Sequence, residues 1–181
     1  MTPEGESVVD TGMPGIGPDE KVLLYAGAFE PGKRIGVLLD QFLEFRRTGA
    51  GRGWHFILAG EGKLEFELRR MASSEPNVHF LPPAVGDETL AALYRRADLT
   101  ALVSRKEPGG ETLRGAMASG CAVLATDGVG CASELIEPGK TGWCVDSAHP
   151  ELWFDYPKAA SKAKLKAMGE AAAIRAKTGE P

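Results

Sequence analysis

The chain has 181 residues, of which 43% are hydrophobic and 25% charged, and its formal net charge is −4. These values are typical of one globular domain with a substantial core. The mild acidic balance argues against nucleic acid as a partner, because phosphate backbones are bound by clustered Lys and Arg. No stretch approaches the ~20 apolar residues that span a bilayer, and no signal segment opens the chain. We therefore expect a cytoplasmic protein that contacts a membrane only through a partner domain.

The three cysteines are Cys121, Cys131 and Cys144, and they form no C-x-x-C pair. An odd count without such a pair indicates reduced thiols in a cytosolic protein. No Cys/His cluster with metal-ligand spacing is present, and no D-x-D occurs. We therefore expect neither a metal nor a cofactor.

Strand-like and helix-like segments alternate between residues 21 and 145. Repeated strand–helix units with short connections predict an α/β fold, a Rossmann-like parallel sheet with helices on both faces. Ligands of such sheets bind beyond the carboxyl ends of the strands. The expected strands are Lys21–Ala26, Trp54–Ala59, Val78–Leu81, Leu99–Val103, Cys121–Ala125 and Thr141–Val145, and the expected helices are Ile35–Arg47, Leu64–Met71, Asp87–Arg95 and Glu111–Ser119.

The two ends of the chain lack this alternation. Residues 1–20 combine Gly, Pro and acidic residues without periodicity, which predicts a flexible lead-in before a domain over residues 21–146. Residues 147–181 are expected to form a C-terminal helical tail. Because its apolar residues are mostly alanine, its docking face is thin. We expect this tail to be mobile, or to dock on something outside the chain.

The segment from Glu107 to Gly120, EPGGETLRGAMASG, predicts a helix that starts with an acidic residue and a pair of glycines. Backbone N–H groups at a helix start bind anions, and glycine lets a ligand come close. A carboxylate beside such an anion site suits a ligand that carries both phosphate and hydroxyl groups. The alternative is a helix cap in which the carboxylate only interacts with the helix dipole.

This segment resembles the donor-binding signature E-P-F-G-x-x-x-x-E-A-M-A-x-G of retaining GT-B glycosyltransferases, in the glycosyltransferase 4-like (group 1) family. The chain is similar to their C-terminal, donor-binding domain, the C-terminal half of the GT-B fold. The resemblance implies that Glu107 binds hydroxyls of the donor sugar. It implies that Gly109 and Gly110 lend backbone N–H groups, and it adds Pro108 and Glu111 to the donor site.

The chain departs from that signature at Gly115, where the family has a Glu that binds the ribose. A charged hydrogen bond is worth roughly 1.5–3 kcal/mol, so we expect donor affinity to be about ten- to a hundredfold weaker. Glu111 lies one helical turn earlier and is a candidate for partial replacement.

The loop from Gly27 to Arg34, GAFEPGKR, joins a predicted strand to a predicted helix. It nearly matches the P-loop G-x-x-x-x-G-K-S/T, but Arg34 stands where a hydroxyl would hold Mg²⁺. It also resembles the family's G-R-x-x-x-x-K-G, whose Arg and Lys neutralise the donor diphosphate. Lys33 matches the Lys and Ala28 replaces the Arg, which leaves Arg34 as a candidate for the missing charge. The alternative is a Gly-Pro turn with solvated basic residues.

Two further segments resemble the family. Gly60 lies in an A-G-x-G turn after the second predicted strand, where a tight turn needing small residues is an equal alternative. The text from Asn77 to Asp98 is similar to the family's N-V-x-F-L-G…E-x-L-x-x-L-Y-x-x-A-D, although most of it is expected to be core and caps. The resemblance implies that Leu81 to Val85 flank the nucleotide base.

Together these segments predict the donor domain of a hexosyltransferase-type enzyme that binds a nucleotide-diphospho-sugar. We expect it to need an N-terminal acceptor-binding domain or a separate acceptor subunit, so that the isolated chain is inactive. Lys33 and Glu107 are the predicted catalytic residues, since cations on the diphosphate stabilise the leaving group. The alternatives are a degenerate, non-enzymatic sugar-nucleotide-binding domain and a P-loop-like nucleotidase.

Overall fold

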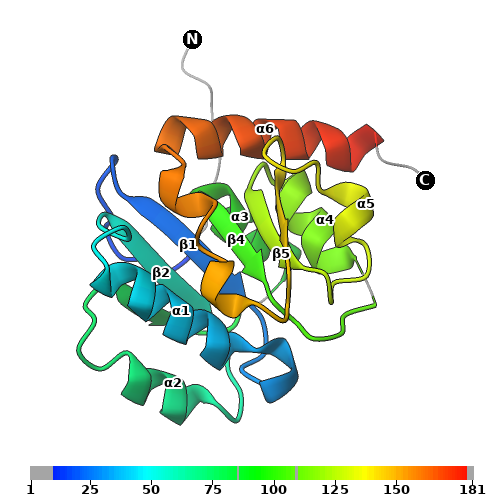
Figure 1. Ribbon diagram of the computed structural model, residues 1–181. Helices are drawn as coiled ribbons and strands as arrows, with labels where there is room; N and C mark the ends of the chain where they lie inside the picture. The colour runs from blue at the N-terminus through cyan, green and yellow to red at the C-terminus, as the bar shows by residue number, and fades with distance from the viewer. Residues whose placement is uncertain (1–9, 85, 109, 179–181) are drawn as a thin grey trace.

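A computed structural model describes residues 10–84, 86–108 and 110–178. Its strands form one six-stranded parallel sheet in the order β3-β2-β1-β4-β5-β6 (Figure 1). The central strands are almost entirely buried, as expected for a parallel sheet that is covered on both faces. The strands are β1 (Lys21–Ala26), β2 (Trp54–Ala59), β3 (Val78–Leu81), β4 (Leu99–Leu102), β5 (Ala122–Thr126) and β6 (Gly142–Val145).

Helices cover both faces of this sheet, which confirms the predicted Rossmann-like fold. Leu23 and Tyr25 of β1 enter the core under α1 and α2, whereas Val22 and Leu24 enter the core under α3, α4 and α5. This alternation follows from the two-residue period of a strand. The helices are α1 (Ile35–Arg47), α2 (Glu65–Met71), α3 (Asp87–Arg96), α4 (Glu111–Ala118), α5 (Ala132–Leu135) and α6 (Lys162–Thr178), with short 3₁₀ helices η1 (Pro31–Lys33), η2 (Pro150–Leu152) and η3 (Pro157–Ala159).

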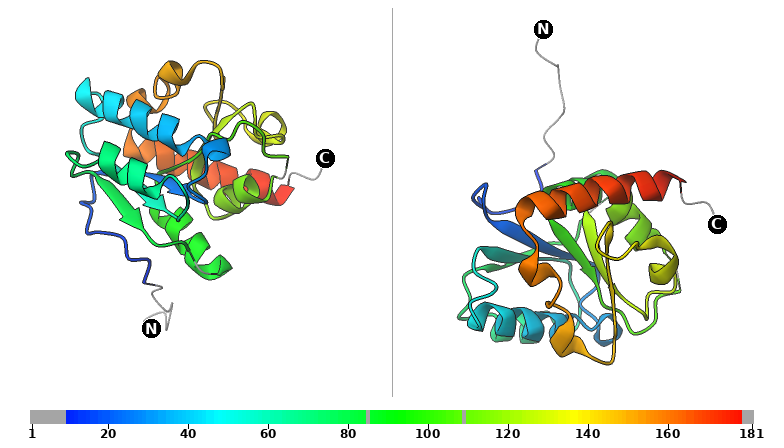
Figure 2. Two further views of the ribbon diagram at one scale, coloured as in Figure 1. Left: turned by 90° about the horizontal axis from the view of Figure 1, so that it is seen from below. Right: turned by 45° about the horizontal axis from the view of Figure 1, so that its top comes forward.

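The helix α6 lies across the amino ends of the strands (Figures 1 and 2). Leu165 and Met168 are buried in the core, and a Cβ atom on Gly169 would lie 2.0 Å from the Gly120 carbonyl oxygen. The expectation of a tail that is mobile or docked elsewhere is therefore wrong for α6. Its small residues do not weaken the docking; they let the helix approach the backbone before β5 closely.

The segment that joins β6 to α6 returns across α1. Trp153 is fully buried, and its indole Nε1 donates a 2.8 Å hydrogen bond to the Asp146 carbonyl oxygen. Phe154 stacks on Phe45 of α1, with ring centroids 4.8 Å apart. These aromatic contacts attach the connection to the domain.

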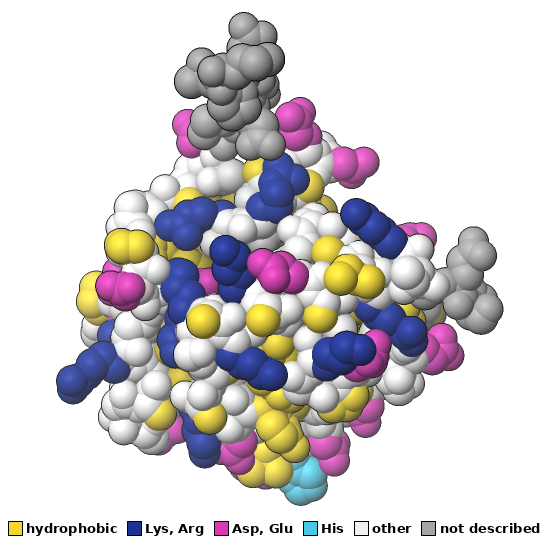
Figure 3. All heavy atoms as spheres, turned by 90° about the horizontal axis from the view of Figure 1, so that it is seen from above, with side chains coloured by type: hydrophobic (Ala, Val, Ile, Leu, Met, Phe, Trp, Pro, Cys, Tyr) yellow, Lys and Arg dark blue, Asp and Glu magenta, His cyan; other side chains and the backbone are white. Residues whose placement is uncertain are grey.

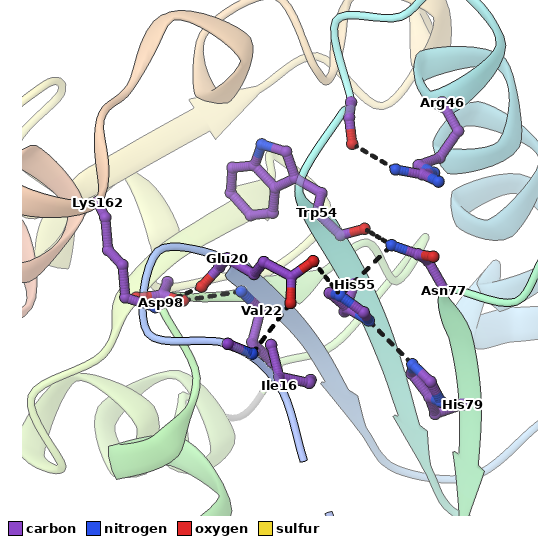
Figure 4. Close-up of polar contacts among 12 residues, drawn as sticks. Ile16, Glu20, Val22, Arg46, Trp54, His55, Asn77, His79, Asp98 and Lys162 are labelled. Atoms are coloured by element: carbon purple, nitrogen blue, oxygen red, sulfur yellow. Dashed lines mark hydrogen bonds and ion pairs between the residues drawn. The ribbon is translucent and has the colours of Figure 1, made fainter. Parts of the chain in front are cut away.

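The described part of the lead-in also contacts the domain. Ile16 is buried, and its carbonyl oxygen accepts a 3.3 Å hydrogen bond from Arg96. Glu20 lies 3.1 Å from His55 of β2, whose other ring nitrogen lies 3.0 Å from His79 of β3 (Figure 4). Residues 16–20 are thus bound to the sheet, in contrast to the expected flexible lead-in; residues 1–9 lie outside the described part.

Candidate functional site

The candidate site lies where the strand order reverses, at the carboxyl ends of β1 and β4. The chain leaves β1 toward β2 on one side and β4 toward β5 on the other, so the two following loops diverge and leave a crevice. A cavity of about 100 Å³ occupies this position. It is lined by Tyr25, Ala26, Gly27, Ala28, Lys33, Thr100, Ala101, Leu102, Ser104, Glu107 and Thr112.

The two predicted catalytic residues meet in this cavity although they are 74 positions apart in the sequence. Lys33 Nζ lies 3.1 Å from Glu107 Oε2, and the Lys33 and Glu107 side chains are 38% and 17% exposed. The Ser104 hydroxyl donates a 2.7 Å hydrogen bond to the same carboxylate oxygen. The site therefore places a cation, an anion and a hydroxyl beside one another, within reach of solvent.

The loop after β5 holds Glu107 in place. The backbone N–H of Glu107 donates to the Gly128 carbonyl oxygen at 3.0 Å, and Gly130 N–H donates to the Glu107 carbonyl oxygen at 2.9 Å. A Cβ atom on Gly128 would lie 2.4 Å from the Ser104 carbonyl oxygen, so the loops fit only with glycine there. Thr126 Oγ1 donates to that same carbonyl oxygen at 3.0 Å. This glycine-containing loop thus positions the carboxylate through its backbone.

The loop after β1 presents Lys33 at the end of η1. The Tyr25 hydroxyl supports this loop by donating a 2.7 Å hydrogen bond to the Ala28 carbonyl oxygen. Burial raises the pKa of Tyr25, and the charge of Glu107 raises it further, so Tyr25 stays a neutral donor. The backbone N–H of Arg105 donates to the Gly32 carbonyl oxygen at 3.2 Å, which ties the two site loops together.

The structure does not bring Arg34 to this cation–carboxylate pair. Arg34 has a left-handed backbone with φ of 55°. Its Nη1 donates to the Ser147 carbonyl oxygen at 2.7 Å, and its guanidinium lies 5.0 Å from the Trp153 ring centroid. Arg34 lines a separate cavity between α1 and α2. The idea that Arg34 replaces the charge absent at Ala28 is not supported by this geometry.

The remaining predicted donor residues lie around the same edge of the sheet. Gly27 is exposed. A Cβ atom on Gly60 would lie 1.9 Å from the Gly27 carbonyl oxygen, so the packing of these two loops requires glycine at position 60. Gly60 N–H donates to the Leu81 carbonyl oxygen at 3.1 Å, which places Leu81 beside these loops. Val85 and Gly109 lie outside the described residues.

The start of α4 is built on Gly110, whose carbonyl oxygen accepts a 2.8 Å hydrogen bond from Arg114 N–H. A Cβ atom on Gly110 would lie 2.4 Å from Cys131 Sγ, so a larger residue there would have to displace the Cys131 side chain. Pro108 and Glu111 are exposed. By contrast, a Cβ atom on Gly115 would only touch the Tyr94 ring, at 3.9 Å. Packing therefore does not explain glycine at position 115.

Ser104 is a site residue that the sequence interpretation missed. It is buried, and it lies three positions before Glu107 and two positions after Leu102, the last residue of β4. A hydroxyl at the carboxyl end of a strand was an available signal. Among the described residues, no group of three or more His, Cys, Asp or Glu is arranged to hold a metal ion.

The family model for glycosyl transferases group 1 matches residues 12–173. The chain belongs to this family. It is 36% identical over 169 residues to a D-inositol 3-phosphate glycosyltransferase of Pseudarthrobacter chlorophenolicus, covering 90% of this chain and 40% of the relative. A protein of the same name from Nocardia farcinica is 32% identical over 149 residues, which cover 78% of this chain and 33% of the relative. The chain thus spans 33–40% of the length of these two curated relatives.

Solved structures show the same fold. The C-terminal domain of a group 1 glycosyltransferase from Francisella tularensis superposes with a TM-score of 0.73 at 19% identity, covering 93% of this chain and 88% of that one. TarM of Staphylococcus aureus, described in complex with UDP, gives a TM-score of 0.75 at 21% identity, covering 87% of this chain and 32% of that chain. The described residues have the fold of the C-terminal half of a GT-B glycosyltransferase.

Within this group 1 domain, none of the described helices is both long enough and apolar enough to cross a membrane. The carboxylate and cation of its two signature loops, Glu107 and Lys33, form the ion pair described above.

Proposed function

We propose that the chain is the nucleotide-sugar-binding half of a retaining hexosyltransferase, and that an acceptor-binding domain or subunit completes the enzyme. The observation that carries this proposal is the ion pair of Lys33 and Glu107 at the strand-order reversal of a group 1 family domain. A nucleotide-diphospho-sugar has groups that complement both residues, since its diphosphate is anionic and its sugar carries hydroxyls.

Binding of the donor would exchange the partners of this pair. The diphosphate would replace Glu107 as the partner of Lys33, and the released carboxylate would accept hydrogen bonds from sugar hydroxyls. Ser104 would keep the carboxylate in position, because its 2.7 Å hydrogen bond does not depend on Lys33. When the bond between the anomeric carbon and the phosphate oxygen breaks, negative charge grows on the diphosphate, where Lys33 would stabilise it.

The small volume of the cavity supports the need for a second part. Drug-sized ligands usually occupy pockets of about 300–1,000 Å³, whereas the cavity at Lys33 and Glu107 measures about 100 Å³. The rest of the ligand would lie against surfaces outside this cavity. The resemblance to the family implies that those surfaces face the acceptor half.

The first test is a calorimetric panel of UDP-, GDP- and ADP-sugars on the chain, with and without Mg²⁺. We expect one class to bind without Mg²⁺, because no hydroxyl follows Lys33 to hold the metal. Lys33→Ala should weaken this binding about ten- to a hundredfold, the value of a charged hydrogen bond. Lys106→Ala is the matched control, since Lys106 is exposed, lies beside Glu107 in sequence and does not line the cavity.

Equal weakening by Lys33→Ala and Lys106→Ala would contradict the assignment of Lys33. Binding of ATP that requires Mg²⁺, with no binding of sugar nucleotides, would instead favour the P-loop-like nucleotidase. Mixing the chain with the missing acceptor half should produce sugar transfer, whereas the chain alone should produce none.

A degenerate, non-enzymatic binding domain is the second candidate, and Gly115 and Ala28 favour it. Both positions lack the charged side chain that the family signatures carry there. Donor binding without transfer in the presence of the acceptor half would support this alternative.

We also infer a cytoplasmic location, no metal or cofactor, no nucleic acid partner and membrane contact only through the partner domain. The three unpaired cysteines support the location, because reduced thiols are typical of cytosolic proteins. Fractionation of cells that express the full-length protein would test it.

A further inference from the structure

A second concave site lies at the opposite, amino edge of the sheet. It is a cleft of about 470 Å³ between the end of α3 and the first turns of α6. Figure 3 views the molecule from the α6 side and shows Lys and Arg side chains gathered on this face. The lining residues are Arg95, Arg96, Ala97, Asp98, Gly120, Lys162, Ala163, Leu165 and Lys166.

The cleft has a strong positive excess in a chain whose net charge is −4. Four of its lining residues are Lys or Arg, and the only carboxylate among them is Asp98. Asp98 is already occupied, because its Oδ2 accepts a 2.8 Å hydrogen bond from Val22 N–H and lies 3.3 Å from Lys162 Nζ (Figure 4). One carboxylate therefore cannot neutralise the cleft.

Much of this positive charge is available to a ligand. Within the described part of the chain, the side chains of Arg95 and Lys166 make no hydrogen bond or ion pair. Arg96 uses one Nη to donate to the Ile16 carbonyl oxygen, and a guanidinium has five N–H donors. The cleft thus offers several donors on convergent cations, which is the chemistry that binds phosphate oxygens.

The positions of these cations have different energetic consequences. Arg95 and Arg96 lie in the last turn of α3, where the helix dipole favours positive charge. Lys162 and Lys166 lie one turn apart in the first turns of α6, where like charges repel and the dipole disfavours cations. A helix-end preference therefore explains the arginines. Lys162 is held by Asp98 and by the Glu20 carbonyl oxygen, but the helix dipole does not explain Lys166 beside Lys162. An anion in the cleft would relieve the repulsion between them.

The charges of Asp98 and Lys162 also affect Lys21, at the start of β1. Burial lowers its pKa, Asp98 opposes that shift, and Lys162 lowers the pKa further. Lys21 is held beside the cleft by a 3.1 Å hydrogen bond from its Nζ to the Ala160 carbonyl oxygen. We propose that the cleft between α3 and α6 is a binding site for phosphate groups, separate from the donor site.

The test uses inorganic pyrophosphate as the probe, on the chain carrying Lys33→Ala so that the proposed donor site does not contribute. Calorimetry should detect binding that weakens as salt is raised, because exposed charges are screened. Adding Arg95→Gln and Lys166→Gln should weaken it about tenfold, since two charged contacts are removed at exposed positions. Both side chains are exposed, so the variant should melt at nearly the parent temperature.

The matched control adds Lys164→Gln and Lys177→Gln, which remove two charges from the same helix without touching the cleft lining. This variant should bind pyrophosphate within about twofold of the parent. Equal weakening by the two double variants would reduce the effect to net charge and overturn the proposal, as would the absence of pyrophosphate binding.

Sedimentation with vesicles then distinguishes the source of the phosphate. Vesicles of phosphatidylglycerol and phosphatidylcholine, in a ratio of about 1:4, are compared with vesicles of pure phosphatidylcholine. Both are tested over about the same salt range as the calorimetry. Capture by the anionic vesicles that is lost with Arg95→Gln and Lys166→Gln identifies a lipid headgroup. Pyrophosphate binding without capture identifies a free phosphate compound. Both results support the phosphate site.

Discussion

The two edges of the sheet use charge in opposite ways. At the carboxyl edge, Lys33 and Glu107 neutralise each other at 3.1 Å in a small cavity between two loops. At the amino edge, four cations share a larger cleft with one carboxylate, and a long helix lies across the strands. A balanced pair on loops can exchange partners when a ligand with both phosphate and hydroxyls arrives. An unbalanced cleft on helices is suited to bind an anion without rearrangement.

The largest expected effect is a loss of fold stability from a substitution at the amino edge. Gly169→Val should destabilise the fold by about 1–3 kcal/mol through overpacking, because a Cβ atom there would lie 2.0 Å from the Gly120 carbonyl oxygen. Urea unfolding measures this change. Glu170→Val, on an exposed neighbour in α6, is the control and should cost far less. A Gly169→Val variant as stable as the parent would contradict the close packing of α6.

Donor binding by the folded fraction of Gly169→Val should remain near the parent value, because the donor site lies at the other edge. Calorimetry at a temperature well below the unfolding transition tests this. A large loss of affinity in the folded protein would show that the two edges are coupled.

The next effect concerns the carboxylate of the ion pair. Glu107→Ala should weaken binding of a nucleotide sugar more than binding of the matching nucleoside diphosphate, by about tenfold or more, the value of charged hydrogen bonds to the sugar. The reason is that only the sugar nucleotide has hydroxyls for the carboxylate. Paired titrations of the two ligands measure the difference. Equal losses would mean that Glu107 acts only as a partner of Lys33.

Ser104→Ala sharpens this result. It removes the 2.7 Å hydrogen bond that orients the carboxylate but keeps the Glu107 charge. The ratio of its affinities for the nucleotide sugar and the nucleoside diphosphate should lie between the ratios of the parent and of Glu107→Ala. Thr112→Ala, which also removes a hydroxyl from the cavity lining, is the comparison variant.

Much of the fold was predictable because the buried strands read as continuous apolar runs and the helices as periodic ones. The juxtaposition of Lys33 and Glu107 also follows from the sequence, once the loops after β1 and β4 are placed at one strand-order reversal. The direction of Arg34 was not predictable, since it depends on a left-handed backbone and on the distant Trp153. Likewise, the docking of α6 depends on a contact of Gly169 with Gly120, which no periodic pattern reveals.

A smaller effect is expected at the position where the family signature is broken. Gly115→Glu should raise the free energy of unfolding by up to about 1 kcal/mol through helix propensity, because a Cβ atom at this position meets only the Tyr94 ring, at an ordinary contact distance of 3.9 Å. It should also strengthen nucleotide binding if the family's ribose contact applies here. Urea unfolding without ligand and calorimetry with ligand separate the two gains. A more stable variant with unchanged affinity would contradict the ribose assignment.

The smallest effect is a pH dependence of stability near the amino edge. Burial, and then the neighbouring His55, lower the pKa of His79 below its ordinary value. The unfolded chain therefore takes up a proton at this histidine before the folded chain does, and stability falls as the pH drops below about 6.5. Exposed His149 has the opposite shift, because a hydrogen bond from its ring to Glu151 raises its pKa. Its contribution is present at low pH and is lost as the pH rises through the folded pKa.

Two single variants each remove one of these two contributions to the pH dependence of stability. His79→Asn should make stability fall less steeply as the pH drops from about 7 to 5, whereas His149→Asn should make it fall more steeply, because the variants remove contributions of opposite sign. Urea unfolding at several pH values measures both slopes. Donor affinity in His79→Asn should keep the pH dependence of the parent, since His79 does not line the cavity at Lys33 and Glu107. Slopes that change in the same direction in both variants would contradict the opposite pKa shifts of His79 and His149.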